Sequence, residues 1–89
     1  MKNFTNKVAV ITGAGSGMGR YLAVLLAKAG ANVAICEINP ITLAETEAML
    51  KDYSVKVTSH IIDVADKAAI DVLPAQVIEL HGHVDMVFN

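Results

Sequence analysis

Four glycines lie close together near the N-terminus, in the stretch Thr12-Gly-Ala-Gly-Ser-Gly-Met-Gly19. Glycine reaches backbone conformations with positive φ, and it lets the main chain approach an anion without a Cβ in the way. A helix that begins in this stretch adds unpaired N–H groups and a partial positive charge. The pattern therefore predicts a phosphate-binding turn, with contacts from Gly13, Gly15, Ser16, Gly17, Met18 (through its backbone N–H) and Gly19.

The spacing of these glycines separates the turn from two other phosphate-binding motifs. Gly13, Gly17 and Gly19 form G-x-x-x-G-x-G, with Gly15 as an additional glycine. G-x-G-x-x-G is excluded because Met and Arg stand at positions 18 and 20, and no Gly-Lys-[Ser/Thr] follows as in a P-loop. The alternative interpretation is a flexible strand-to-helix turn that binds no ligand.

A carboxylate stands 20 residues after Gly17, where Glu37 ends a second apolar run. A carboxylate there can accept hydrogen bonds from both hydroxyls of an adenosine ribose, and it repels a 2′-phosphate. Sites for NADP favour Arg or Lys in this neighbourhood, but Ser16 and Ile38 occupy the expected places. Glu37 therefore predicts NAD in preference to NADP, and the alternative is an ordinary solvated glutamate at a strand end.

The elements that position these residues alternate along the whole chain. Apolar runs typical of buried strands cover 7–12, 32–37, 55–62 and 84–88, and helical patterns lie between them. We expect one α/β domain over residues 1–89, with the order β-α-β-α-β-α-β of a partial Rossmann fold and a parallel sheet in the strand order 3-2-1-4. In such a sheet, ligands bind at the carboxyl ends of the strands, between the first strand and the fourth.

Several residues predict how the helices begin, pack and end. The first helix carries an apolar stripe from Met18 to Ala29, which we expect to face the core. Asn39 and Pro40 predict the start of a second helix that runs to residue 53, and Asp66 can cap a third helix. Pro74 lies inside the third helix, where we expect a kink.

Composition and charge exclude several classes of protein. Apolar residues make up 54% of the chain and charged residues 18%, which rules out disorder. The net charge of −2 and the scattered Lys and Arg give no surface for nucleic acid and no polybasic membrane patch. The single cysteine cannot form an internal disulfide, the apolar runs are shorter than the roughly 18 residues of a membrane span, and the N-terminus lacks the features of a signal peptide. We expect a soluble, cytoplasmic protein.

Taken together, these residues resemble the short-chain dehydrogenase/reductase family. Residues 12–19 look like its T-G-x-x-x-G-x-G loop, and Glu37 stands where members that prefer NAD carry an acid. Asp63 and Val64 look like the pair that contacts the adenine, the first by its side chain and the second by its backbone. The stretch 84–89 looks like the run into the family's N-N-A-G strand end. The resemblance implies a bound NAD and, in the complete enzyme, hydride transfer between NAD(H) and an alcohol or carbonyl substrate.

The residues that this family uses for catalysis, a Ser, a Tyr-x-x-x-Lys pair and an Asn, have no match in the 89 residues. Tyr53 is followed by Lys56 at i+3, and Tyr21 has Leu25 at i+4, so neither pairs a phenol with an ammonium for proton transfer. We therefore predict no catalytic residue here and expect the cofactor-binding N-terminal part of an oxidoreductase that continues past residue 89. The alternatives are a stand-alone NAD-binding module and a structural remnant; the glycine spacing disfavours another nucleotide ligand such as S-adenosylmethionine.

The remaining candidates predict structure rather than chemistry. Asp63 has a second interpretation, as a helix-entry residue that bonds nearby backbone amides. Two histidines flank Gly82 in a turn while His60 is remote in sequence, which makes a poor set of metal ligands. Cys36 is expected in the core, and Arg20 on a solvated surface rather than on a pyrophosphate. The predicted strand over 84–88 would form an apolar sheet edge, through which we expect self-association.

Overall fold

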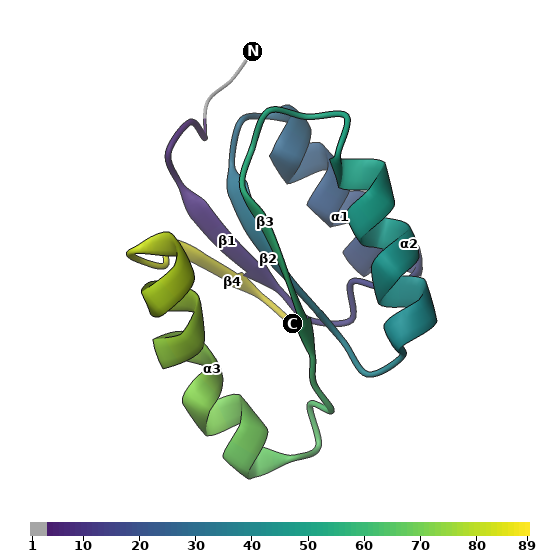
Figure 1. Cartoon of the computed structure of the whole chain (residues 1–89), viewed down its shortest axis with the longest axis vertical. Coiled ribbons are helices and arrows are strands. Elements are labelled where there is room, and N and C mark those ends of the chain that lie inside the picture. The colour runs from purple at the N-terminus through teal and green to yellow at the C-terminus, as the bar shows by residue number, and fades with distance from the viewer. Residues whose placement is uncertain (1–3) are drawn as a thin grey trace.

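The computed structural model describes residues 4–89 of the chain. Over these residues, four strands alternate with three helices, and Figure 1 shows their arrangement. In chain order they are β1 (Val8–Ile11), α1 (Gly17–Lys28), β2 (Asn32–Glu37), α2 (Pro40–Leu50), β3 (Val57–Ile61), α3 (Lys67–His81) and β4 (Met86–Phe88). All three strand pairs are parallel, and the order across the sheet is β3-β2-β1-β4. The predicted fold class and strand order are confirmed.

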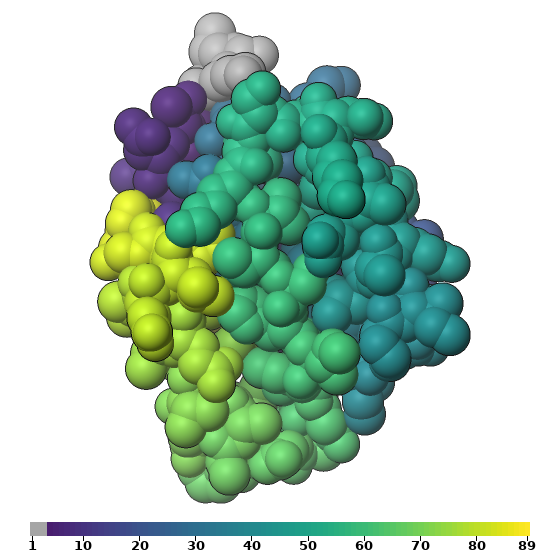
Figure 2. All heavy atoms as spheres, in the orientation of Figure 1, coloured from purple at the N-terminus to yellow at the C-terminus, as the bar shows by residue number. Residues whose placement is uncertain are grey.

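The sheet is covered on both faces, so β1 and the four middle residues of β2 are apolar and buried. Alternate residues of β1 and β2, such as Ile11 and Ile35, point into one cluster with buried residues of α1 and α2. Their neighbours in sequence, such as Val10 and Cys36, point into a second cluster with Leu73 and Val77 of α3. Helices α1 and α2 therefore lie on one face of the sheet and α3 on the other (Figure 1). In Figure 2, α2, the residues of β3 and α3 meet on the surface that faces the viewer.

Side-chain caps fix where the second and third helices begin. The Asn39 side chain accepts hydrogen bonds from the backbone N–H groups of Ile41 (2.9 Å) and Thr42 (3.4 Å), directly before Pro40 at the first position of α2. The Asp66 side chain accepts one from Ala69 N–H at 3.2 Å at the start of α3. Both caps agree with the prediction. They end the loops that follow β2 and β3 at the carboxyl edge of the sheet.

The packing of α1 differs from its predicted stripe. Met18 is 81% exposed and Leu25 is 43% exposed, whereas Ala23, Leu26 and Ala27 are buried. The small residues Ala23 and Ala27 face the sheet, so the helix packs closely against it. The larger side chains of Met18 and Leu25 lie on the outer side of the helix. The prediction that the Met18 side chain lies in the core is wrong.

Several element ends also differ from the predicted ones. Strand β4 begins at Met86; just before it, the Asp85 N–H donates to the Val8 carbonyl at 2.9 Å, and the Val8 N–H donates to the Asp85 carboxylate at 2.9 Å. Helix α2 ends at Leu50 rather than at residue 53. Helix α3 continues through the exposed Pro74 as one element. Within residues 4–89, none of the helices has the length and apolar character needed to cross a membrane.

Candidate functional site

The glycine-rich loop connects the carboxyl end of β1 to the start of α1. Gly13 and Gly17 have φ of 65° and 58°, in the left-handed region that other residues enter at a cost. Gly19 has no positive φ, but a Cβ there would collide with the backbone of Gly13. Each glycine of the G-x-x-x-G-x-G pattern is therefore required, two by backbone conformation and one by close approach.

The start of α1 is open to an anion. Ser16 occupies the cap position but its side chain makes no capping bond, and the first turn of the helix holds no acidic residue. Backbone N–H groups at a helix start attract negative charge when no side chain of the protein satisfies them. The loop and the helix start together fit a phosphate group.

Two hollows meet at Gly13. The larger, about 720 Å³, lies between α1 and β4, and Ser16, Met18 and Gly19 are among its lining residues. The smaller, about 100 Å³, is lined by Gly13, Glu37, Ile38, Ile62, Asp63 and Val64. The structure thus brings together the predicted residues from the ends of β1, β2 and β3. Gly15 and Gly17 line neither hollow.

Glu37 is the last residue of β2, and its carboxylate lies against the glycine-rich loop. One carboxylate oxygen accepts the N–H of Gly15 at 2.9 Å, and the other accepts those of Ile38 (3.2 Å) and Asn39 (3.4 Å). Gly15 has no room for a Cβ, because that atom would lie 2.6 Å from the Glu37 Cγ and would also collide with the Thr42 hydroxyl. Glu37 is therefore not an ordinary solvated glutamate, because its carboxylate accepts hydrogen bonds from three backbone N–H groups.

Asp63 and Val64 follow β3 at the edge of the smaller hollow. The Asp63 carboxylate accepts the N–H of Ala65 at 2.9 Å, which is the local backbone bond considered as its second interpretation. Both side chains are exposed, and the cap of α3 is provided separately by Asp66. Asp63 therefore keeps a free face toward the hollow that it lines together with Glu37.

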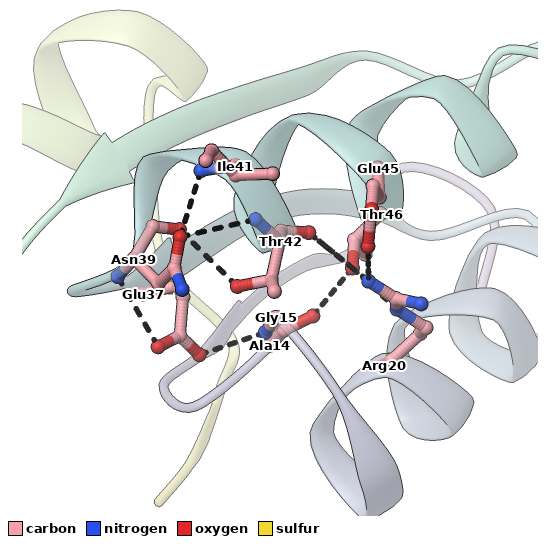
Figure 3. Close-up of polar contacts among 9 residues, drawn as sticks. All are labelled: Ala14, Gly15, Arg20, Glu37, Asn39, Ile41, Thr42, Glu45 and Thr46. Carbon is pink, nitrogen blue, oxygen red and sulfur yellow. Dashed lines mark hydrogen bonds and ion pairs between the residues drawn. The ribbon is translucent and has the colours of Figure 1, made fainter.

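A polar network that the sequence did not reveal ties the loop to α2 (Figure 3). The buried hydroxyl of Thr46 donates to the Ala14 carbonyl at 2.7 Å and accepts from Arg20 Nε at 2.9 Å. Arg20 also donates to the Thr42 carbonyl at 3.1 Å and forms an ion pair with Glu45 at 3.0 Å. The prediction of a solvated Arg20 is wrong. A signal did exist, since Thr46 interrupts the apolar stripe of Leu43 and Leu50 on α2.

The histidines form two separate contacts. His83 pairs with Asp85 at 2.9 Å, while His60 and His81 both lie against the Thr58 hydroxyl, at 3.0 and 2.7 Å. His60 is distant from His81 in sequence, yet both histidines contact Thr58 of β3. In the part of the chain that the structure describes, no three potential ligands gather around a metal position.

Burial changes the acidity of several of these groups. It lowers the pKa of His60, and it lowers the pKa of His81 together with the charges of nearby Lys56, His60 and His83. Burial also raises the pKa of the Cys36 thiol to about 12, as fits a residue of the core rather than a nucleophile.

Known proteins are similar to this chain in both sequence and fold. Residues 7–89 match the family model described as short chain dehydrogenase. An uncharacterized oxidoreductase of Thermotoga maritima is 39% identical over 83 residues, which cover 93% of this chain and 32% of that protein. The short chain dehydrogenase/reductase astE of Aspergillus oryzae is 39% identical over 84 residues, which cover 93% of this chain and 32% of that protein.

Solved structures give the same result. The structure of NAD⁺-bound xylitol dehydrogenase superimposes with a TM-score of 0.93 and 30% identity, over 97% of this chain and 33% of that one. Carveol dehydrogenase from Mycobacterium avium, in complex with NAD, gives a TM-score of 0.90 and 30% identity over 98% of this chain and 36% of that one. The chain therefore belongs to the short chain dehydrogenase family, and it spans about a third of the length of these relatives.

Proposed function

We propose that this chain binds NAD as the N-terminal, cofactor-binding portion of an oxidoreductase. The observation that carries the proposal is the meeting of Gly13, Glu37, Asp63 and Val64 around one hollow, beside an open helix start. Two similar structures, NAD⁺-bound xylitol dehydrogenase and carveol dehydrogenase in complex with NAD, support it.

The residues divide the dinucleotide between them. Backbone N–H groups of the loop and of the start of α1 hold the pyrophosphate, except those of Ala14 and Gly15, which donate to the Cys36 carbonyl and the Glu37 carboxylate. Glu37 accepts the ribose hydroxyls, and Asp63 and Val64 hold the adenine in the smaller hollow. The nicotinamide end then extends toward the larger hollow between α1 and β4, where a bound NAD supplies a hydride acceptor.

The same arrangement favours NAD over NADP. Glu37 and Asp63 are the charged residues among those lining the smaller hollow, and both are acids that repel a 2′-phosphate. Arg20, the cation nearest to the loop in sequence, is held on α2 by Thr46 and Glu45. An adenosine 2′-phosphate therefore meets negative charge without a compensating cation.

The proposal extends to the reaction of the complete enzyme, the domain that the chain forms and its self-association. In the complete enzyme, the reaction is hydride transfer between NAD(H) and an alcohol or carbonyl substrate, with the alternatives of a stand-alone NAD-binding module and a structural remnant. The 89 residues form one dinucleotide-binding domain of a cytoplasmic protein, in which the buried Cys36 stays reduced. Two copies associate through β4, which pairs with β1 on one side and with no other described strand.

Calorimetric titration with NAD and with NADP tests the proposal. We expect the chain to bind NAD more tightly than NADP by about tenfold, the effect of roughly 1.4 kcal/mol. Glu37→Gln keeps an acceptor for Gly15 but removes the charge, so it should narrow this preference. The proposal is contradicted if NAD gives no heat of binding at millimolar concentration, or if NADP binds as tightly as NAD.

A further inference from the structure

Thr46 is the buried polar side chain of the described core. It lies on the sheet-facing side of α2 with no exposed surface, between Leu43 and Leu50. A hydroxyl in that position destabilises the fold unless its hydrogen bonds are made. Its two principal partners are the Ala14 carbonyl and Arg20 Nε, both from the segment that contains the glycine-rich loop.

The partner of Thr46 belongs to the same peptide unit that holds Glu37. The carbonyl oxygen of Ala14 and the N–H of Gly15 are opposite ends of one planar peptide group. Thr46 donates to the oxygen at 2.7 Å, and the N–H donates to the Glu37 carboxylate at 2.9 Å. As Figure 3 shows, the peptide group is held between α2 and the end of β2. The orientation that satisfies Thr46 therefore aims the Gly15 N–H at Glu37.

Arg20 sets the direction of this chain of hydrogen bonds. A guanidinium only donates, so the Thr46 oxygen must accept from Arg20 Nε and use its own proton as a donor. Of the two carbonyls within reach of that proton, Ala14 lies at 2.7 Å and Thr42 at 3.2 Å, so the shorter bond is to Ala14. The guanidinium is itself fixed by the Thr42 carbonyl and Glu45. Three elements, α1, α2 and the loop, are thereby coupled to the position of one carboxylate.

We propose that Thr46 and Arg20 are positioning residues, which orient the Ala14–Gly15 peptide and through it hold Glu37 in place for the cofactor ribose. This inference rests on the proposed function for its consequence in NAD binding. Neither residue contacts the cofactor. Their loss changes affinity and the choice between NAD and NADP by releasing Glu37 from the loop.

Two substitutions of Thr46 separate this role from simple packing. Thr46→Val keeps the shape of the side chain but removes the hydroxyl, and Thr46→Ser keeps the hydroxyl but removes a methyl group. We expect Thr46→Val to weaken NAD binding by about tenfold, the scale of one buried hydrogen bond, and to reduce the preference for NAD over NADP. Thr46→Ser should bind NAD almost as the unaltered chain does. A packing role predicts the reverse order of the two variants.

The amide of Gly15 provides a readout that does not depend on NAD. Hydrogen exchange of this amide, followed by NMR in the free chain, should become faster in Thr46→Val and stay slow in Thr46→Ser. Arg20→Met should accelerate it to a smaller extent. Thr58→Val is the matched control, since it removes a half-buried threonine hydroxyl on the opposite face of the sheet and should leave Gly15 unchanged.

The outcomes distinguish the two proposals. If the unaltered chain does not bind NAD, the proposed function is wrong, and exchange of the Gly15 amide alone decides the positioning role. If Gly15 exchanges in Thr46→Val as slowly as in the unaltered chain, or if Thr46→Ser is the more damaging substitution, the positioning role is wrong.

Discussion

Gly15 and Gly19 both lack room for a side chain, but different atoms occupy the space. A Cβ at Gly19 would meet the backbone of Gly13 and Ala14, which cannot move without changing the loop. A Cβ at Gly15 would meet the side chains of Glu37 and Thr42, which can rotate away. Neither glycine has a positive φ, so a comparison of the two isolates the steric effect.

We therefore predict different consequences for the two alanine variants. Gly19→Ala should lower the free energy of unfolding by about 2 kcal/mol, within the usual range for overpacking, and Gly15→Ala should lower it by about 1 kcal/mol or less. Gly15→Ala should instead reduce NAD affinity more than stability, because it displaces Glu37. Urea unfolding and NAD titration of both variants check this; equal losses of stability would contradict it.

At the residue scale, the sequence revealed the groups whose spacing repeats a known pattern. The glycines and Glu37 could be predicted because their residue types and their spacing, with Glu37 20 residues after Gly17, repeat that pattern. Thr46 and Arg20 could not, because their bonds join residues 26 to 32 positions apart and depend on how α2 packs on α1. The prediction for Met18 is wrong because helical periodicity shows which side of a helix is apolar, but not how closely that side packs on the sheet.

At the scale of elements, the contact between β3 and α3 depends on two uncharged imidazoles. His60 and His81 share the Thr58 hydroxyl, and burial lowers the pKa of both below the ordinary 6.5. Below pH 6.5 the unfolded chain binds protons that the folded chain does not, so protonation favours unfolding. The stabilisation is complete above pH 6.5 and is lost as pH falls through the lowered pKa values.

We predict that the melting temperature falls between pH 7.5 and pH 5.5 and that His60→Gln with His81→Gln makes this fall smaller. Calorimetric melting of the unaltered chain and the double variant across that interval measures the effect. A fall of the same size in both proteins would show that these histidines are not responsible.

The order and direction of the elements could be predicted better than their ends. Alternating apolar runs and helical patterns imply parallel strands in one order, because right-handed crossovers leave few topologies. The ends depend on single contacts, as where the Asp85 carboxylate accepts the Val8 N–H directly before β4 begins. The bend expected at Pro74 stays a prediction, since α3 continues there as one helix.

At the scale of the whole molecule, β4 is an edge strand of the sheet without a fully buried residue. Its Val87 is 61% exposed, and apolar hollows lie on both of its faces, lined by Leu22 and Leu25 of α1 on one side and by Ile70 and Ile78 of α3 on the other. Within residues 4–89, only β1 pairs with it. An apolar edge with unpaired backbone groups favours association with a second chain.

We predict that the chain self-associates and that Val87→Lys, which places a charge on this edge, makes it monomeric. Val72→Lys is the matched control, because Val72 is 50% exposed on α3 and lines neither of the hollows beside β4. Sedimentation velocity over a series of concentrations measures the effect. A sedimentation coefficient that stays at the monomer's value at every concentration of the unaltered chain would refute the association.

If the ends of β1, β2 and β3 form one NAD site, an NMR titration of the labelled chain with NAD will show it. We expect the backbone amides of residues 13–19, 37 and 63–64 to shift together along one binding curve, while those of α3 stay unchanged. S-adenosylmethionine at the same concentration should produce no such shifts. Shifts spread evenly over the chain, or confined to residues away from the glycine-rich loop, would contradict the account.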